Sequence, residues 1–272
     1  MIAAKLCLDA LADDTQHFYR RVICVLDDAG IASLSGGAYA LAQYTGIVRH
    51  TKDLDIFVRP ADARRALSAL AAAGYRTEIT FAHWLGKAFS AGNLVDIIFS
   101  SGNGVAKVDD LWFTHAQPAR FLDEDVLVCP AEEMIWSKAF IQERERFDGA
   151  DINHLIRAVG HDLDWKRLLW RFGPHWRVLL GHLVVFGFVY PSDRDAVPLW
   201  LMRELLGRLQ REMSAATSER AVCQGALLSR TQYVADIEQW GYADARLDPE
   251  SGMTAEQVRA WTDAGLREQH SG

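Results

Sequence analysis

Two carboxylates, Asp53 and Asp55, stand two residues apart at the start of the apolar segment Leu54 to Val58. On a β-strand, residues two apart point to the same face. Neighbouring ionised carboxylates repel one another unless a cation or a proton lies between them. Hard oxygen ligands at this spacing suit Mg²⁺ or Mn²⁺, so the pattern predicts a metal site. The simpler alternative is a strand start whose acids face water.

A third carboxylate, Asp96, lies inside the apolar run Leu94 to Phe99. An acid in such a run is unfavourable unless it is paired, coordinated or at an edge. If its strand neighbours that of Asp53 and Asp55, three acids converge and can hold metal ions that activate an attacking oxygen and bind a triphosphate. Asp96 could also accept the proton of the incoming nucleophile. The alternative is an edge acid paired with Lys or Arg.

The tripeptide Ser35-Gly36-Gly37 joins an expected strand, 31–35, to an expected helix, 38–46. Glycines let the backbone approach a ligand closely, and a helix N-terminus offers N–H groups to phosphate. We therefore expect Ser35, Gly36 and Gly37 to hold the β- and γ-phosphates of a nucleotide. No Gly-Lys-Ser/Thr follows, so this is not a P-loop. An ordinary turn is the alternative.

These residues need a sheet to position them. Strands are expected at 31–35, 54–58, 76–82, 86–91, 94–100 and 124–130, with helices at 16–30, 38–46 and 61–74. From residue 131 the pattern is mostly helical, beginning with an amphipathic helix over 131–147, and the tail from Glu219 is less regular. The expected fold class is α+β: a small mixed sheet with helices over residues 1–128, then a helical domain over 129–272.

Composition limits the class of protein. The net charge is −7, which argues against a protein that coats nucleic acid non-specifically. The four scattered cysteines contain no CxxC pair, and residues 1–14 do not read as a signal peptide. The most apolar run, Val178 to Tyr190, is shorter than a membrane span and contains His182, so it is expected to be a buried helix. A cytoplasmic protein with reduced thiols and no membrane partner is expected.

The segment from Ser35 to Phe57 resembles the signature of the polymerase-β-type nucleotidyltransferase superfamily. It is most similar to the AbiEii-like branch of uncharacterised bacterial nucleotidyltransferases. That branch has a Gly-Gly pair, a short helix and then Arg-x-Thr/Ser-x-Asp-hydrophobic-Asp, followed later by a strand with one acid. The matching residues here are Gly36, Gly37, Arg49, Thr51, Asp53, Asp55 and Asp96. The resemblance implies that Thr51, like Arg49, takes part in nucleotide binding. Gly37 stands where many superfamily members carry Ser, so one side-chain contact to phosphate is not expected.

The resemblance extends over residues 30 to 160 and includes a weaker helical motif. A Lys on one helix precedes an Asp-x-x-Asp that opens the next, which implies that Lys138, Asp148 and Asp151 take part in nucleotide binding. From the residues alone, Lys138 could equally lie along an apolar face with its charge in water, and the two acids could cap a helix. Arg49 and Lys52 could contact the triphosphate or only neutralise the acids.

The resemblance implies a Mg²⁺- or Mn²⁺-dependent nucleotidyltransferase, with Asp53, Asp55 and Asp96 as metal ligands and catalytic residues. It would transfer NMP from an NTP to an acceptor hydroxyl and release pyrophosphate. The base, the acceptor (RNA, protein or small molecule) and the oligomeric state do not follow from the sequence. Two alternatives stay open: a toxin-like enzyme acting on a tRNA end, and a non-catalytic module that keeps the fold and binds a nucleotide or a partner.

Overall fold

The computed structural model describes residues 11–49, 51, 53–216, 220–249 and 251–270. The chain divides into two compact units, Met1–Pro130 and Ala131–Gly272. The first contains a mixed sheet with helices, and the second is mostly helical, so the expected α+β class is confirmed.

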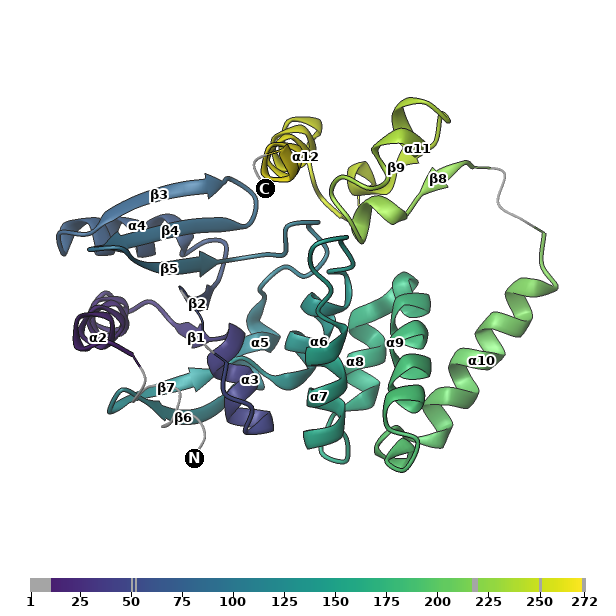
Figure 1. The fold of residues 1–272 in the computed structure, drawn as a ribbon, viewed down its shortest axis with the longest axis horizontal. Helices are drawn as coiled ribbons and strands as arrows, with labels where there is room; N and C mark the ends of the chain where they lie inside the picture. Colours follow the sequence, from purple (N-terminus) through teal and green to yellow (C-terminus); the bar gives the residue numbers. More distant parts are fainter. Residues whose placement is uncertain (1–10, 50, 52, 217–219, 250, 271–272) are drawn as a thin grey trace. The chain divides into compact units, whose positions relative to one another are not determined.

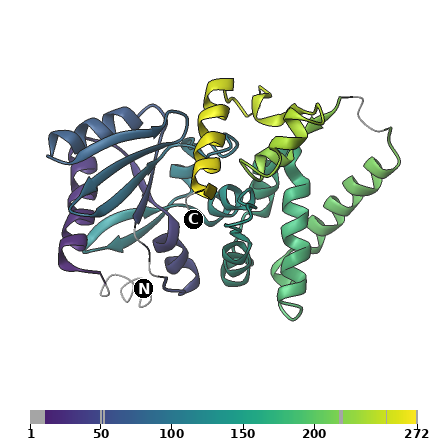
Figure 2. The ribbon, with the colours of Figure 1, turned by 45° about the horizontal axis from the view of Figure 1, so that its top comes forward.

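The first unit is built on a seven-stranded sheet of order β3-β4-β5-β2-β1-β7-β6. Figure 2 shows these strands side by side in purple to teal. The β2–β5 and β1–β7 pairs are parallel, and the other neighbours are antiparallel. The strands are β1 (Ser33–Ser35), β2 (Asp53–Val58), β3 (Arg76–Phe81), β4 (Leu85–Ser90), β5 (Asn93–Ile98), β6 (Gln117–Phe121) and β7 (Glu124–Val128).

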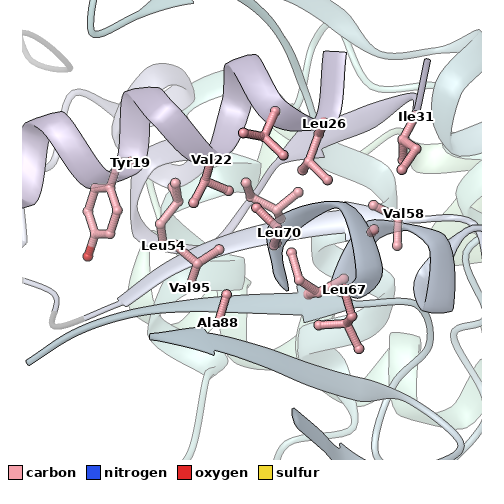
Figure 3. Close-up of a cluster of buried hydrophobic side chains, with 14 of the residues drawn as sticks. Tyr19, Val22, Leu26, Ile31, Leu54, Val58, Leu67, Leu70, Ala88 and Val95 are labelled. Carbon is pink, nitrogen blue, oxygen red and sulfur yellow. The ribbon is translucent and has the colours of Figure 1, made fainter. Parts of the chain in front are cut away.

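Two helices, α2 (Asp13–Asp28) and α4 (Ala63–Ala72), bury their apolar residues with the strands in one core. Val22 and Leu26 of α2 and Leu70 of α4 pack in this core with Leu54 and Val95 of the two central strands (Figure 3). Burial alternates along β2, with Leu54, Ile56 and Val58 buried. Because strand side chains alternate between faces, the core fixes which face β2 presents away from these helices.

Two further helices belong to this unit. They are α3 (Gly37–Thr45), which follows β1 directly, and α5 (Asp110–Thr114). The ring of Trp112 in α5 lies 5.0 Å from the ring of Phe57 on β2. Neither α5 nor β6 is among the expected elements.

The second unit begins with α6 (Ala131–Ala139), α7 (Gly149–Val159), α8 (Trp165–Phe172), η1 (Gly173–His175), α9 (Trp176–Val189), η2 (Arg194–Ala196) and α10 (Leu199–Met213) (Figure 1). It continues with β8 (Val222–Cys223), η3 (Gly225–Leu227), α11 (Val234–Glu238), β9 (Ala243–Asp244), η4 (Ala245–Leu247) and α12 (Ala255–His270). The sixteen-residue helix α12 lies in the tail that was expected to be less regular.

The helix expected over 131–147 is wrong beyond residue 139. The chain leaves α6 after Ala139 and makes a tight reversal in which Gln142 bridges Phe147 and the N–H of Glu143 donates to the carbonyl of Arg146. The reversal brings Asp148 back to Lys138, 2.7 Å away. These tertiary contacts outweigh the helix propensity of the Glu-Arg-Glu-Arg run.

Among the described residues, one stretch, Trp165–Val189, is long and apolar enough by length and composition to cross a membrane. It comprises α8, η1 and α9, and 39% of its most apolar window is buried. Leu179, Leu183 and Phe186 of α9 are buried, whereas Val184 and Phe188 are exposed. The run expected to form a buried helix is therefore buried along one side only.

Candidate active site

The face of β2 that points away from the α2–α4 core carries Asp53 and Asp55. Both are partly buried and alternate with the core residues Leu54 and Ile56. On β5, Asp96 alternates in the same way with Val95 and Ile97. The apolar residues of each strand thus place its acids on the opposite face.

The parallel register of β2 and β5 sets Asp55 directly beside Asp96. One carboxylate oxygen from each of Asp53, Asp55 and Asp96 lies within 4.8 Å of the others. No other group of three possible metal ligands of this kind occurs in the described part of the chain. The sequence-based expectation that the three acids converge is met, and we call these residues the acidic trio.

The acidic trio fits a hard divalent cation. All three ligand atoms are carboxylate oxygens, the donors that Mg²⁺ and Mn²⁺ prefer, and they are close enough together to share an ion. No His or Cys belongs to the group, so the softer ligand set typical of structural zinc is not present in it. Asp53, Asp55 and Asp96 are therefore the residues that could hold the metal.

Two members of the trio, Asp53 and Asp96, are each held by a neighbouring side chain. The hydroxyl of Thr51 donates a 2.5 Å hydrogen bond to Oδ1 of Asp53. The ammonium of Lys87, on β4, donates to Oδ1 of Asp96 at 2.7 Å. Thr51 was expected to contact the nucleotide, and here its hydroxyl contacts a carboxylate of the trio. Lys87 was not singled out from the sequence.

The turn from β1 into α3 lies against the same carboxylates. The N–H of Gly36 donates to the backbone carbonyl of Asp55 at 2.9 Å, which ties the turn to β2. Gly37 has a φ of +54°, in the left-handed region that favours glycine, and a Cβ there would lie 2.8 Å from Cγ of Asp55 and closer still to Oδ2. A Cβ on Gly36 would overlap the ring of Phe57. Both glycines are required by close approach to β2.

The first residue of the expected phosphate cradle, Ser35, ends β1 and is buried, with its carbonyl accepting from the N–H of Cys129. The N-cap of α3 is Gly36, which has no side chain to cap the first turn. The first N–H groups of α3 thus begin at Gly37, next to Asp55. A helix start beside a carboxylate cluster is suited to a phosphate that reaches a metal.

Burial and nearby charges raise the pKa of two groups in this region, Asp96 and Tyr19. Desolvation, together with the charge of Asp53, raises the pKa of Asp96 above its usual value, although the ammonium of Lys87 works in the opposite direction. Tyr19 of α2 is fully buried, and desolvation followed by the charges of the trio raises its pKa to about 12. The trio is therefore a concentrated negative charge at the edge of an apolar core.

The remaining expected nucleotide contacts lie in different places. Arg49 is partly buried in the segment between α3 and β2. Lys52 lies outside the described residues. In the second unit, the ammonium of Lys138 contacts Asp148 at 2.7 Å and Asp151 at 2.8 Å, and all three side chains are at most 15% exposed.

This Lys138 group is thus a partly shielded ion cluster between the end of α6 and the start of α7. Asp148 also receives Arg146 at 3.1 Å. Burial raises the pKa of Asp148, but Lys138 and Arg146 together lower it below its ordinary value. The ammonium of Lys138 is paired with two carboxylates, so the alternative in which its charge lies in water is wrong. The contacts join α6 to α7 whatever else the lysine does.

Residues 17–173 match the model of a family described as uncharacterised nucleotidyltransferases. None of the curated proteins compared with the chain matches it. Among solved structures, the antibiotic-resistance factor ANT(2'')-Ia is similar, with 14% identity, 63% of this chain and 98% of that chain covered, and a TM-score of 0.45. An antigenic nucleotidyltransferase-like protein from Paracoccidioides brasiliensis has 16% identity, 69% and 95% coverage and a TM-score of 0.47.

A third similar structure is the lincosamide antibiotic adenylyltransferase LnuA with bound lincomycin. It has 14% identity, 53% and 96% coverage and a TM-score of 0.38. These likenesses are too distant to indicate a substrate. The family match covers more than half of the chain and includes β1, β2 and β5, the strands that carry the turn and the acidic trio.

Proposed function

The chain belongs to this family of uncharacterised nucleotidyltransferases, and on that premise we propose that it transfers NMP from an NTP to an acceptor hydroxyl by means of Mg²⁺ or Mn²⁺ bound to Asp53, Asp55 and Asp96. The single observation that carries the proposal is the convergence of these three carboxylates beside the N-terminus of α3. The enzyme class follows from the family; the metal, the roles of the residues and the acceptor are proposed.

A bound divalent cation would supply positive charge to the triphosphate and to the attacking oxygen. The residues of the chain supply the rest. Asp53 and Asp55 bind the metal, and Thr51 keeps the Asp53 carboxylate in one orientation. The Gly36–Gly37 turn and the first N–H groups of α3 hold the β- and γ-phosphates, so that the α-phosphorus lies near the trio.

Asp96 is either the third ligand or the base in this scheme. As the base, it accepts the proton of the acceptor hydroxyl while the oxygen forms a bond to the α-phosphorus and the bond to pyrophosphate breaks. A role of Lys138 in nucleotide binding stays a prediction from the sequence, since its ammonium is paired with Asp148 and Asp151.

The test incubates the protein with each labelled NTP, Mg²⁺ or Mn²⁺, and separate pools of RNA, protein and small hydroxylated compounds. We expect label to enter one pool, with release of pyrophosphate, and to disappear in Asp53→Asn and Asp55→Asn. Asp110→Asn is the matched control, because Asp110 lies in the same unit, its side chain is 84% exposed and it pairs with Arg59.

If no label moves and the NTPs do not bind in a metal-dependent way, the non-catalytic module is the better description. Transfer to the RNA pool alone would favour the toxin-like tRNA-end enzyme. Membership of the AbiEii-like branch and a cytoplasmic location stay predictions from the sequence.

A further inference from the structure

A row of charged residues crosses four strands of the sheet on the face that carries the acidic trio. In the registers of the strands, Glu78 on β3 lies opposite Lys87 on β4, Lys87 opposite Asp96 on β5, and Asp96 beside Asp55 on β2. Facing residues on neighbouring strands are close enough to interact directly. The row therefore contains one cation, Lys87, directly beside one member of the trio, Asp96, with Asp55 on the next strand.

Lys87 contacts the trio and not its other neighbour in the row. Its ammonium lies 2.7 Å from Oδ1 of Asp96, and the two side chains are only 20% and 13% exposed. Glu78 is instead paired with Arg76 at 3.1 Å, at the exposed edge of the sheet. Salt screens a shielded ion pair of this kind less than a surface pair. The positive charge of Lys87 therefore acts on the trio with little screening.

The position of Lys87 follows from packing as well as from charge. Its neighbours Gly86 and Ala88 are buried, and Gly86 lies against Leu67 of α4, which leaves no room for a Cβ. Since strand residues alternate, this fixes Lys87 on the opposite face, where the carboxylates are. The bond from a fixed strand to Oδ1 then limits the rotation of the Asp96 carboxylate.

Resting on the proposed function, we propose that Lys87 is a positioning residue and the built-in counter-ion of the metal site: it orients Asp96 and cancels one of the three negative charges of the acidic trio. With all three charges uncompensated, the trio would attract a bare cation strongly and repel the triphosphate. With Lys87 in place, a cation binds less tightly alone, and the nucleotide meets a smaller repulsion. On this proposal, Lys87 would stay bound to Asp96 when a metal is present.

Three substitutions separate orientation from charge. Lys87→Met removes both, Lys87→Gln keeps a hydrogen-bond donor without the charge, and Lys87→Arg keeps the charge. Lys107→Met is the matched control, because Lys107 is exposed and lies in the same unit. The readouts are the Mn²⁺ affinity of the nucleotide-free protein, from the electron paramagnetic resonance signal of free Mn²⁺, and kcat and KM for the NTP at saturating Mg²⁺.

We expect Lys87→Met and Lys87→Gln to bind Mn²⁺ on the order of tenfold more tightly than the wild type, since a nearby positive charge has been removed. We expect kcat to fall on the order of tenfold in Lys87→Met and less in Lys87→Gln, which still orients Asp96. Lys87→Arg and Lys107→Met should have the Mn²⁺ affinity of the wild type. If Lys87→Met does not fold, the Mn²⁺ affinity of Lys87→Gln tests the effect of the charge.

A neutral variant that binds Mn²⁺ with unchanged affinity overturns the inference, even if it melts at a lower temperature, because a merely structural lysine would behave in that way. A neutral variant that binds Mn²⁺ more tightly but has a higher kcat shows that Lys87 competes with the metal, and this also overturns it. If the wild type neither binds Mn²⁺ nor transfers label from an NTP, the proposed function fails and the inference with it. Wild-type binding with no difference among the variants overturns the inference alone.

Discussion

The side chain of Asp55 occupies the space that a side chain at the position of Gly37 would need. A Cβ on residue 37 would lie 2.8 Å from Cγ of Asp55, and residue 37 has a φ of +54°. The Ser that many members of the wider superfamily carry at this position therefore does not fit this arrangement. The absent hydroxyl is the consequence of a carboxylate that lies directly against the start of α3.

Gly37→Ala is expected to lower the transfer rate by roughly 100-fold or more, because the new methyl group must displace the Asp55 carboxylate from the trio. Metal-dependent transfer by the purified variant is the measurement. Gly30→Ala is the control, since Gly30 also has a positive φ, +64°, but has no atom near its Cβ direction. Equal losses in both variants would show that backbone strain, and not the contact with Asp55, causes the effect.

Asp96→Asn is expected to raise the melting temperature of the metal-free protein at neutral pH while it reduces transfer. Burial and the charge of Asp53 raise the pKa of Asp96 in the folded state, so its protonated form stabilises the fold. That stabilisation is complete below the unfolded pKa and is lost as the pH rises through the folded pKa. The difference between variant and wild type should therefore shrink as the pH falls.

Mg²⁺ or Mn²⁺ should reverse the order of the melting temperatures of the wild type and Asp96→Asn. A ligand that binds only the folded state at 100 times its Kd stabilises it by about 2.7 kcal/mol. The wild type should gain stability with either cation, and Asp96→Asn should gain less, as followed by thermal unfolding. An equal gain in both proteins would remove Asp96 from the set of metal ligands.

Asp148→Asn should change the melting temperature at neutral pH in the direction opposite to Asp96→Asn. Although burial raises the pKa of Asp148, Lys138 and Arg146 lower it overall, so the ionised form stabilises the fold. This stabilisation is present above the unfolded pKa and is lost as the pH falls through the folded pKa. The variant should melt below the wild type at neutral pH and approach it in acid, as measured by circular dichroism. A pH-independent difference would contradict the assignment.

Glu133→Ala is expected to destabilise the second unit by about 3 kcal/mol, because it takes a fully buried carboxylate from two buried guanidinium groups, of which Arg167 keeps Glu132 at 2.7 Å. Glu133 is fully buried and contacts Arg167 and, at 3.1 Å, Arg171. Denaturant unfolding measures the change. Glu212→Ala is the control, since the Glu212–Arg177 pair is exposed and such pairs contribute little. Similar losses in both variants would contradict the prediction.

The convergence of the trio could be predicted only on the condition that β2 and β5 are neighbours, because Asp53 and Asp55 stand at the start of one apolar strand and Asp96 inside another. That pattern marks Asp53, Asp55 and Asp96 as polar positions on strands whose other face is buried. The role of Lys87 could not be predicted, because it depends on the register between β4 and β5. A single sequence does not state which residues of two strands face each other. Thr51 was assigned to the nucleotide from the resemblance, and its hydrogen bond to Asp53 depends on a geometry that the sequence does not state.

The errors at element boundaries have equally physical causes. Residues 140–147 include the Glu-Arg-Glu-Arg run, which favours a helix, and the chain turns there because of contacts such as Asp148 with Lys138, the bridge from Gln142 to Phe147 and the Glu143–Arg146 backbone hydrogen bond. Pro118 obscures β6, which is an edge strand, the place in a sheet where a proline is tolerated. Such contacts between distant residues are not visible as periodicity.

The parallel pairing of β2 with β5 also bears on when the repulsion between the carboxylates is overcome. The register sets Asp55 beside Asp96 as soon as the sheet has formed, before any cation or nucleotide arrives. The unfavourable work of bringing like charges together is thus done once, during folding, by the burial of Leu54, Ile56, Val95 and Ile97. Each later turnover begins from charges already gathered, and a catalytic cycle need not repeat that work.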